Sequence, residues 1–344
     1  MQKSFLIFTL FLIGCASHAP LAETGHFAYT LASGGYPREY GVYAPPSYTG
    51  KKPLPLVVIL HGGGGTGRGM LRDTNWQAKA DAENFLIAYP DGLARDPSQP
   101  ARFQGNPRTW NDGSGRFTHG KDAEAIDDVA FLDAMLDQIV KNFAVDTKRI
   151  YVTGFSNGAS MTFRFGEQSK RRIAAIAPVA GACWNPQPRL RHPVPLCYVT
   201  GAADPLNPLD GGRITFLGAA RAVNTVPKPP VSESIARWCA ALGESTPLVQ
   251  REVLDSGVSV MSNMKTNSAK EVVFVTIPGL GHYWPGGAQN LPQAVAGPFI
   301  DVFDATGFIW EFFAKHGGSQ RNEKKFFLPQ GTPRIVQRND GNTE

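Results

Sequence analysis

A glycine-flanked serine is the residue with the clearest chemical potential in this chain. The segment Gly154-Phe155-Ser156-Asn157-Gly158 has the spacing G-x-S-x-G. Residues 148–153 before it have the pattern of a strand, and residues 157–168 after it have the pattern of a helix. A sharp turn between a strand and a helix lifts a serine hydroxyl out of the sheet. Ser156 is therefore the candidate nucleophile for attack on a carbonyl carbon.

A serine hydroxyl needs a neighbouring base before it can attack. Three histidines follow Ser156 in the chain. His192 precedes a predicted strand, and His316 begins a polar C-terminal segment. His282 directly follows the apolar strand predicted over 272–277, so it is the candidate base.

The base needs an acid that fixes its tautomer and stabilises its charged form. Asp204 follows the strand predicted over 196–200, and Pro205 next to it stiffens the loop. Asp204 is the candidate acid, with Asp210 and Asp255 as alternatives.

A glycine-rich loop offers the donors that a tetrahedral oxyanion requires. His61-Gly62-Gly63-Gly64-Gly65 follows the apolar strand predicted over 54–60. We expect N–H donors from Asn157 and from either Gly63 or Gly64. His61 is expected to brace this loop rather than to act as a base. No Gly-Lys-Ser/Thr sequence follows the glycines, which argues against a phosphate-binding loop.

Three tryptophans are candidates for contact with the substrate. Trp110, Trp184 and Trp284 lie in segments expected near the site, and sugar and phenyl rings pack on such side chains. Burial in the core is the alternative for each.

The elements that position these residues alternate between strand and helix. Residues 26–31 and 37–43 flank a Ser-Gly-Gly turn and predict a leading β-hairpin. Beyond it, short apolar strands alternate with helices, including helices predicted over 70–83, 122–143 and 232–242. This order predicts a mostly parallel, doubly wound α/β sheet whose ligands bind at the carboxyl ends of its strands.

Together these motifs resemble the polyhydroxybutyrate depolymerase and feruloyl esterase group of secreted α/β-hydrolases, which is akin to carbohydrate esterase family one. The resemblance covers roughly residues 25–315 and is carried by the segments 38–46, 57–65, 109–113, 127–129, 151–158, 201–212 and 277–284. It implies an α/β-hydrolase fold, with Ser156 as nucleophile, Asp204 as acid and His282 as base.

Composition limits the other function classes. The 344 residues carry a net charge of +5, and charged residues are only 18% of the chain. The basic residues are scattered, so no nucleic-acid partner is expected. No Cys/His ligand spacing occurs, so we expect neither a metal nor a cofactor.

The N-terminus predicts export. The predominantly apolar segment 5–13, nine residues long, is too short to span a bilayer but suits a signal peptide. Leu12-Ile13-Gly14-Cys15 resembles the lipobox of bacterial lipoproteins. Cys15 would then be lipidated and anchor the protein to a membrane, and Ala16 after it points by resemblance to the outer membrane. Cleavage after Ala19 or Ala22, with release to the periplasm or the outside, is the alternative.

The predicted organisation is a lipoprotein signal peptide over 1–14, a tether over 15–24, a catalytic domain over 25–315 and a flexible tail over 316–344. Three cysteines remain beyond Cys15. Cys197 lies in a predicted strand, so Cys183 and Cys239 are expected to form a disulfide.

These observations predict an exported serine esterase. Its expected substrates are feruloyl or acetyl esters of plant polysaccharide fragments, or hydroxyalkanoate polyesters and oligomers. The alternatives are a catalytically silent surface-binding lipoprotein on the same fold and a serine peptidase-like hydrolase. The sequence predicts no oligomeric state.

Overall fold

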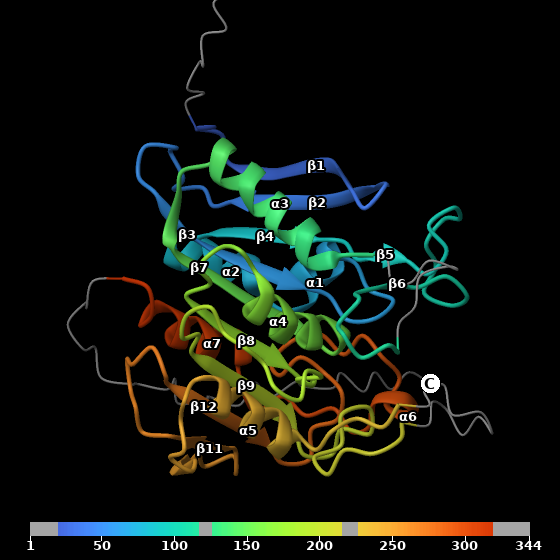
Figure 1. Ribbon diagram of the computed structural model, residues 1–344, viewed down its shortest axis with the longest axis vertical. Coiled ribbons are helices and arrows are strands. Elements are labelled where there is room, and N and C mark those ends of the chain that lie inside the picture. The colour runs from blue at the N-terminus through green and yellow to red at the C-terminus, as the bar shows by residue number, and fades with distance from the viewer. Residues whose placement is uncertain (1–19, 117–125, 215–225, 319–344) are drawn as a thin grey trace, which may run out of the picture.

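The computed structural model describes residues 20–116, 126–214 and 226–318, and its layers are drawn in Figure 1. Within them a sheet of ten strands runs in the order β1-β2-β4-β3-β7-β8-β9-β12-β11-β10. The six central strands, from β4 to β12, pair in parallel, and both edges pair antiparallel. The predicted α/β-hydrolase architecture with a leading hairpin is confirmed.

The bounds of the elements are as follows. The sheet consists of β1 (Gly25–Ser33), β2 (Tyr36–Ala44), β3 (Leu54–Leu60), β4 (Leu86–Pro90), β7 (Val145–Phe155), β8 (Ala175–Val179), β9 (Leu196–Gly201), β10 (Val249–Val253), β11 (Ser259–Ser262) and β12 (Val272–Ile277). A separate pair consists of β5 (Leu93–Ala94) and β6 (Arg108–Thr109). The helices are α1 (Gly67–Asp73), α2 (Trp76–Glu83), α3 (Asp128–Asn142), α4 (Asn157–Gln168), α5 (Val231–Ala241), α6 (Gln293–Ala296) and α7 (Ala305–Ala314).

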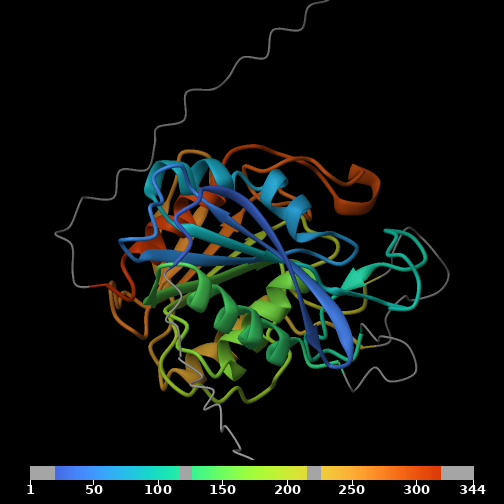
Figure 2. The ribbon, with the colours of Figure 1, turned by 90° about the horizontal axis from the view of Figure 1, so that it is seen from above.

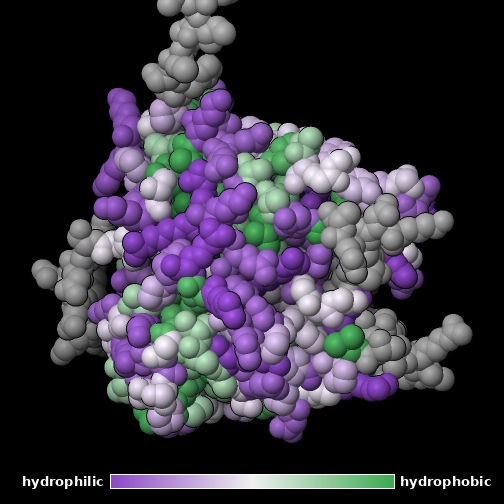
Figure 3. Space-filling model, viewed as in Figure 1, coloured by the Kyte–Doolittle hydropathy of each residue, from purple (hydrophilic) through white to green (hydrophobic). Residues whose placement is uncertain are grey.

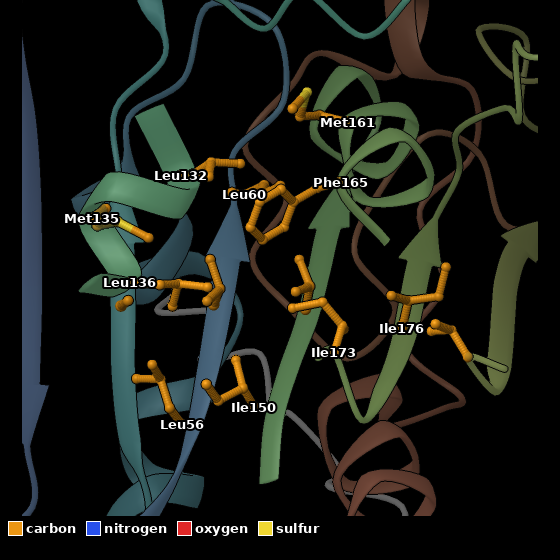
Figure 4. Close-up of a cluster of buried hydrophobic side chains, with 14 of the residues drawn as sticks. Leu56, Leu60, Leu132, Met135, Leu136, Ile150, Met161, Phe165, Ile173 and Ile176 are labelled. Atoms are coloured by element: carbon orange, nitrogen blue, oxygen red, sulfur yellow. The ribbon is translucent and has the colours of Figure 1, made fainter. Parts of the chain in front are cut away.

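Each face of the sheet has its own hydrophobic core. Strand β3 shows why, because Leu56, Val58 and Leu60 enter one core while Val57 and Ile59 enter the other. Helices α3, α4 and α5 cover the first face, and α1, α2 and α7 cover the second (Figure 2). Figure 4 shows the first core, in which Leu132 of α3 points toward Leu60 of β3 and Phe165 of α4, and Leu136 points toward β3 further along the helix.

Some elements differ from the sequence prediction. The helix predicted over 70–83 is two helices, because the Thr74 hydroxyl donates to the Met70 carbonyl and Asn75 adopts a left-handed conformation with φ 58°. The antiparallel strands β10 and β11 were not predicted. β10 has little apolar periodicity, since it lies at the sheet edge with most of its residues exposed.

The parallel strands bring the candidate residues to one edge. The glycine loop follows β3, Ser156 follows β7, Asp204 follows β9 and His282 follows β12. The chain leaves β3 toward β4 on one side and later returns to β7 on the other. Strands β3 and β7 therefore flank a topological switch point, where doubly wound sheets bind their ligands.

Several predictions concern residues that the structure does not describe. The signal peptide over 1–14, the lipidation site Cys15, most of the tether over 15–24 and the tail from 319 onward lie outside the described residues. Among the described helices, none is long and apolar enough to cross a membrane. Figure 3 shows hydrophobic residues in small scattered patches on the face that it presents.

Candidate active site

Ser156 lies on a strained turn between β7 and α4. Its backbone has φ 57° and ψ −116°, which a residue with a side chain adopts only where the surroundings impose it. Its N–H donates to the Val179 carbonyl of β8 at 2.9 Å, so the neighbouring strand holds the turn. The serine is partly exposed, as a candidate nucleophile must be.

The two glycines that flank the turn allow close backbone contacts. A Cβ at Gly154 would lie 2.4 Å from the Gly158 carbonyl oxygen. A Cβ at Gly158 would lie 2.3 Å from the Leu60 carbonyl oxygen at the end of β3. The G-x-S-x-G spacing is therefore required by packing between the turn, its helix and β3.

His282 and Asp204 form a buried pair. The His282 Nδ1 lies 2.7 Å from Asp204 Oδ2, and both side chains are buried. The His282 ring packs on Phe155, the residue before Ser156, with ring centroids 4.7 Å apart. With Nδ1 engaged by the carboxylate, Nε2 is the nitrogen left for a proton from the serine hydroxyl.

The main chain around each partner fixes this pair. The second oxygen of Asp204 accepts the N–H groups of Leu206 and Asn207, each at 2.8 Å. The His282 N–H donates to Ala296 of α6 at 2.6 Å. Three hydrogen bonds therefore hold the Asp204 carboxyl group in place. The alternative acid Asp210 is exposed in the same loop, whereas Asp204 contacts the histidine.

A buried lysine supports the Asp204 loop, and sequence reasoning missed it. Lys228 Nζ donates to the Asn207 amide oxygen at 2.6 Å and to the Leu206 carbonyl at 3.1 Å. Burial lowers the pKa of Lys228 to about 7, and the nearby Asp204 carboxylate acts in the opposite direction. The only sequence signal was a lysine in a segment without clear periodicity.

The glycine loop after β3 lies against the nucleophile. A Cβ at Gly62 would be 3.3 Å from the Ser156 Cβ. The Gly64 N–H donates to the Arg108 carbonyl at 2.7 Å, so it cannot also point at an oxyanion. Gly63 and Gly64 were the two glycines expected to supply an oxyanion donor. Gly64 cannot supply it in this conformation, so the exposed Gly63 remains the candidate donor. Asn157 is the first residue of α4, so its N–H has no hydrogen-bond acceptor within that helix.

His61 braces this loop, as expected. Its Nδ1 lies 2.7 Å from the Gly62 carbonyl, and its Nε2 accepts the Gly92 N–H at 2.9 Å. These partners place the proton on Nδ1, and burial lowers the pKa of the ring, so His61 is neutral.

Two of the three tryptophans are core residues, which corrects the prediction that they contact substrate. Trp110 is fully buried and donates from Nε1 to the His61 carbonyl at 2.9 Å. Trp284 is 4% exposed, donates to the Thr306 hydroxyl at 2.9 Å and packs on Trp76. Trp184 alone is partly exposed, and the Arg116 guanidinium lies 5.3 Å from its ring centre.

The predicted disulfide is wrong. Cys183, Cys197 and Cys239 are all buried free thiols. Helix α5 turns Ser234 toward Cys183, whose N–H donates to the Ser234 hydroxyl at 3.1 Å. Cys239 comes five residues later, which rotates it roughly 140° around the helix and moves it about 7.5 Å along the axis. Cys197 is buried in β9, as expected.

No metal site is found in the described part of the chain. No group of three or more His, Cys, Asp or Glu side chains in it could hold a metal ion.

Comparisons with known proteins show similarity to esterases. Residues 48–214 match the model of a family described as phospholipase/carboxylesterase. A putative esterase of Nocardia uniformis subsp. tsuyamanensis is 29% identical over 81% of this chain and 79% of its own length. A probable feruloyl esterase C of Aspergillus niger is 26% identical over 62% of this chain and 73% of its own length. The structure of an acetyl xylan esterase from Aspergillus awamori superposes with a TM-score of 0.52 at 15% identity, covering 84% of this chain and 99% of that one.

The fold and these similarities define a class, the α/β-hydrolase enzymes. Within that class the chain is a carboxylic ester hydrolase, similar to the group that contains feruloyl and acetylxylan esterases.

Proposed function

We propose that the protein is an exported serine esterase that releases feruloyl or acetyl groups from plant polysaccharide fragments. The observation that carries the proposal is the Asp204–His282 pair at 2.7 Å beside the strained Ser156 turn. Hydroxyalkanoate esters are the second substrate class that the sequence resemblance implies. The names of the similar feruloyl and acetyl xylan esterases favour the carbohydrate-linked esters.

The proposed reaction has two halves. His282 Nε2 takes the Ser156 proton while the hydroxyl oxygen attacks the ester carbonyl carbon. The Gly63 and Asn157 N–H groups stabilise the oxyanion, and His282 returns the proton to the departing alcohol. Water then attacks the acyl-enzyme with the same base, which releases the acid and restores the serine. Asp204 orients the imidazole and stabilises its positive charge in both halves.

The nucleophile is tested with Ser156→Ala. The variant should fold, lose hydrolysis of p-nitrophenyl acetate and fail to react with a fluorophosphonate probe. Ser245→Ala, at an exposed serine, is the matched control and should behave as wild type. Continued labelling of Ser156→Ala by the probe would refute the assignment.

The substrate class is tested with a panel. Methyl ferulate, acetylated xylan, polyhydroxybutyrate and p-nitrophenyl palmitate are compared under one condition. We expect ferulate and acetyl esters to give the highest kcat/KM. A preference for palmitate would contradict the proposal, because long chains need an apolar tunnel that stabilises each methylene by about 0.8 kcal/mol.

Export through lipidation of Cys15 is also part of the proposal. Cys15→Ser should release the protein from membranes into the soluble fraction, whereas Ser17→Ala should leave it membrane-bound. A wild-type protein that is wholly soluble, with Glu23 at its N-terminus, would show the alternative cleavage instead.

A further inference from the structure

An exposed phenylalanine lies beside the glycine loop of the candidate site. Phe103 is 58% exposed, and among the described residues it is the one aromatic side chain in the set of exposed large apolar residues. The other members of that set are aliphatic side chains and a methionine. Single exposed apolar side chains are common on protein surfaces, so the exposure of Phe103 is not by itself evidence of a function. What lies next to the ring is the informative observation.

The ring of Phe103 lies directly on Gly64. A Cβ at Gly64 would be 2.7 Å from Cδ2 and 2.9 Å from Cε2 of the ring. Gly64 also has φ +82°, a conformation that favours glycine. A Cβ at Gly62, two residues earlier, would lie 3.3 Å from the Ser156 Cβ. The ring therefore stands within a few residues of the proposed oxyanion donors.

The segment that carries Phe103 is held in place by hydrogen bonds. We call residues 95–107, between β5 and β6, the arm. Asn106 fixes its base, because its Oδ1 accepts the Asp96 N–H at 2.7 Å and its Nδ2 lies within 3.1 Å of three arm carbonyls. Arg102 next to the ring donates its N–H to the Asn106 carbonyl at 2.8 Å.

The residue that follows the arm is hydrogen-bonded to the glycine loop, and the two ends of the arm are hydrogen-bonded to each other. The Gly64 N–H donates to Arg108 at the start of β6, and the Arg95 N–H donates to the Pro107 carbonyl. One side of the phenyl ring thus packs on the loop while much of the rest faces solvent. A ring needed only for packing would be covered, as the rings of Trp110 and Trp284 are.

We propose that Phe103 forms a stacking subsite for a flat ring of the ester, either an aromatic acyl group or a pyranose of the alcohol part. The proposal rests on the proposed esterase function and adds a specificity-determining residue to it. A phenyl face packs on both kinds of ring through the same apolar and offset-stacking contacts. The Gly63 donor beside it would hold the carbonyl while Phe103 holds the ring.

The test compares esters with and without a ring. Methyl acetate has no ring, phenyl acetate has its ring in the alcohol, and methyl ferulate has its ring in the acyl group. Phe103→Ala and Phe103→Leu should lower kcat/KM for at least one ring-bearing ester by about 3- to 10-fold, mainly through KM. Both should leave methyl acetate within about twofold, and Phe103→Tyr should restore the ring preference.

The ester that responds identifies the part of the substrate that stacks. Val253→Ala, at an equally exposed apolar side chain on the edge strand β10, is the control and should change nothing. An equal loss on all three esters would overturn the proposal, because it would mean that Phe103 supports the loop rather than the substrate. Unchanged kinetics in Phe103→Ala would overturn it as well.

An error in the proposed function would give a different experimental result from an error in the role of Phe103. If wild type cleaves phenyl acetate but neither methyl ferulate nor acetylated xylan, the carbohydrate-ester proposal is wrong, while the Phe103 comparison between methyl and phenyl acetate still stands. If Ser156→Ala retains activity on all esters, the nucleophile is wrong whatever Phe103 does.

Discussion

Asn157 binds both main-chain polar groups of Trp110. The Trp110 N–H donates to Asn157 Oδ1 at 2.7 Å, and Asn157 Nδ2 donates to the Trp110 carbonyl at 3.0 Å. Trp110 in turn donates to the His61 carbonyl in the glycine loop. One side chain therefore links the helix that begins after Ser156 to the loop that carries the proposed second oxyanion donor.

Removing this link should weaken both the fold and the activity. Asn157→Ala keeps the backbone N–H of residue 157 but leaves the main-chain N–H and carbonyl of Trp110 without their partner. It also removes a hydrogen-bond donor that lies 2.9 Å from the buried Asp112 carboxylate. Unpaired buried polar groups cost about 1–3 kcal/mol each, so we expect the free energy of unfolding to fall by about 2–4 kcal/mol. Urea denaturation measures it, and kcat/KM on p-nitrophenyl acetate should fall more than tenfold. Asn290→Ala, at an exposed asparagine, should match wild type; equal stability of both variants would contradict the prediction.

Asp204→Asn should preserve the loop and remove the activity. An asparagine oxygen can still accept the Leu206 and Asn207 N–H groups. Its amide nitrogen cannot accept a hydrogen bond from the His282 Nδ1–H group, so the imidazole loses its working tautomer. We expect kcat on p-nitrophenyl acetate to fall by about 10³- to 10⁴-fold with little change in melting temperature. Asp210→Asn is the matched control, and a comparable loss there would mean that the wrong acid has been assigned.

Lys228 should make stability depend on pH. Burial lowers its pKa from 10.5 to about 7 in the folded protein. Between these values the unfolded chain binds a proton that the folded chain does not, so its contribution to the free energy of unfolding rises with pH. The rise should be about 1 kcal/mol per pH unit from pH 7 to 9. Denaturation of Lys228→Met should lack this rise, whereas Lys51→Met at an exposed lysine should keep it; a parallel rise in both variants would exclude Lys228 as its source.

The three buried thiols should be unreactive in the native protein. Burial raises the pKa of Cys183 to about 12 and that of Cys239 to about 11, so neither forms much thiolate at neutral pH. Iodoacetamide should label Cys183, Cys197 and Cys239 only after denaturation, without prior reduction. Peptide mass spectrometry reads each site, and a Cys183–Cys239 linked peptide from unreduced protein would disprove the free thiols.

The local parts of the site can be predicted from the sequence. The strand β7, the G-x-S-x-G turn and the helix α4 are consecutive, so their pattern of apolar residues and glycines is sufficient to predict the turn at Ser156. The apolar runs of β9 and β12 likewise place Asp204 and His282 after parallel strands, and parallel strands bring their carboxyl ends to one edge.

Features that depend on contacts between distant segments cannot be predicted from the sequence. Gly63 rather than Gly64 is left as a donor because Arg108, 44 positions further on, accepts the Gly64 N–H. Trp110 and Trp284 are buried because segments remote in sequence cover them. Phe103 is a candidate for substrate contact because its ring packs on Gly64, 39 positions earlier in the chain. Lys228 lies beside the Asp204 loop through pairing between Gly212 and Lys228. No local periodicity encodes such contacts, because burial and hydrogen-bond partners are set by where the whole chain packs.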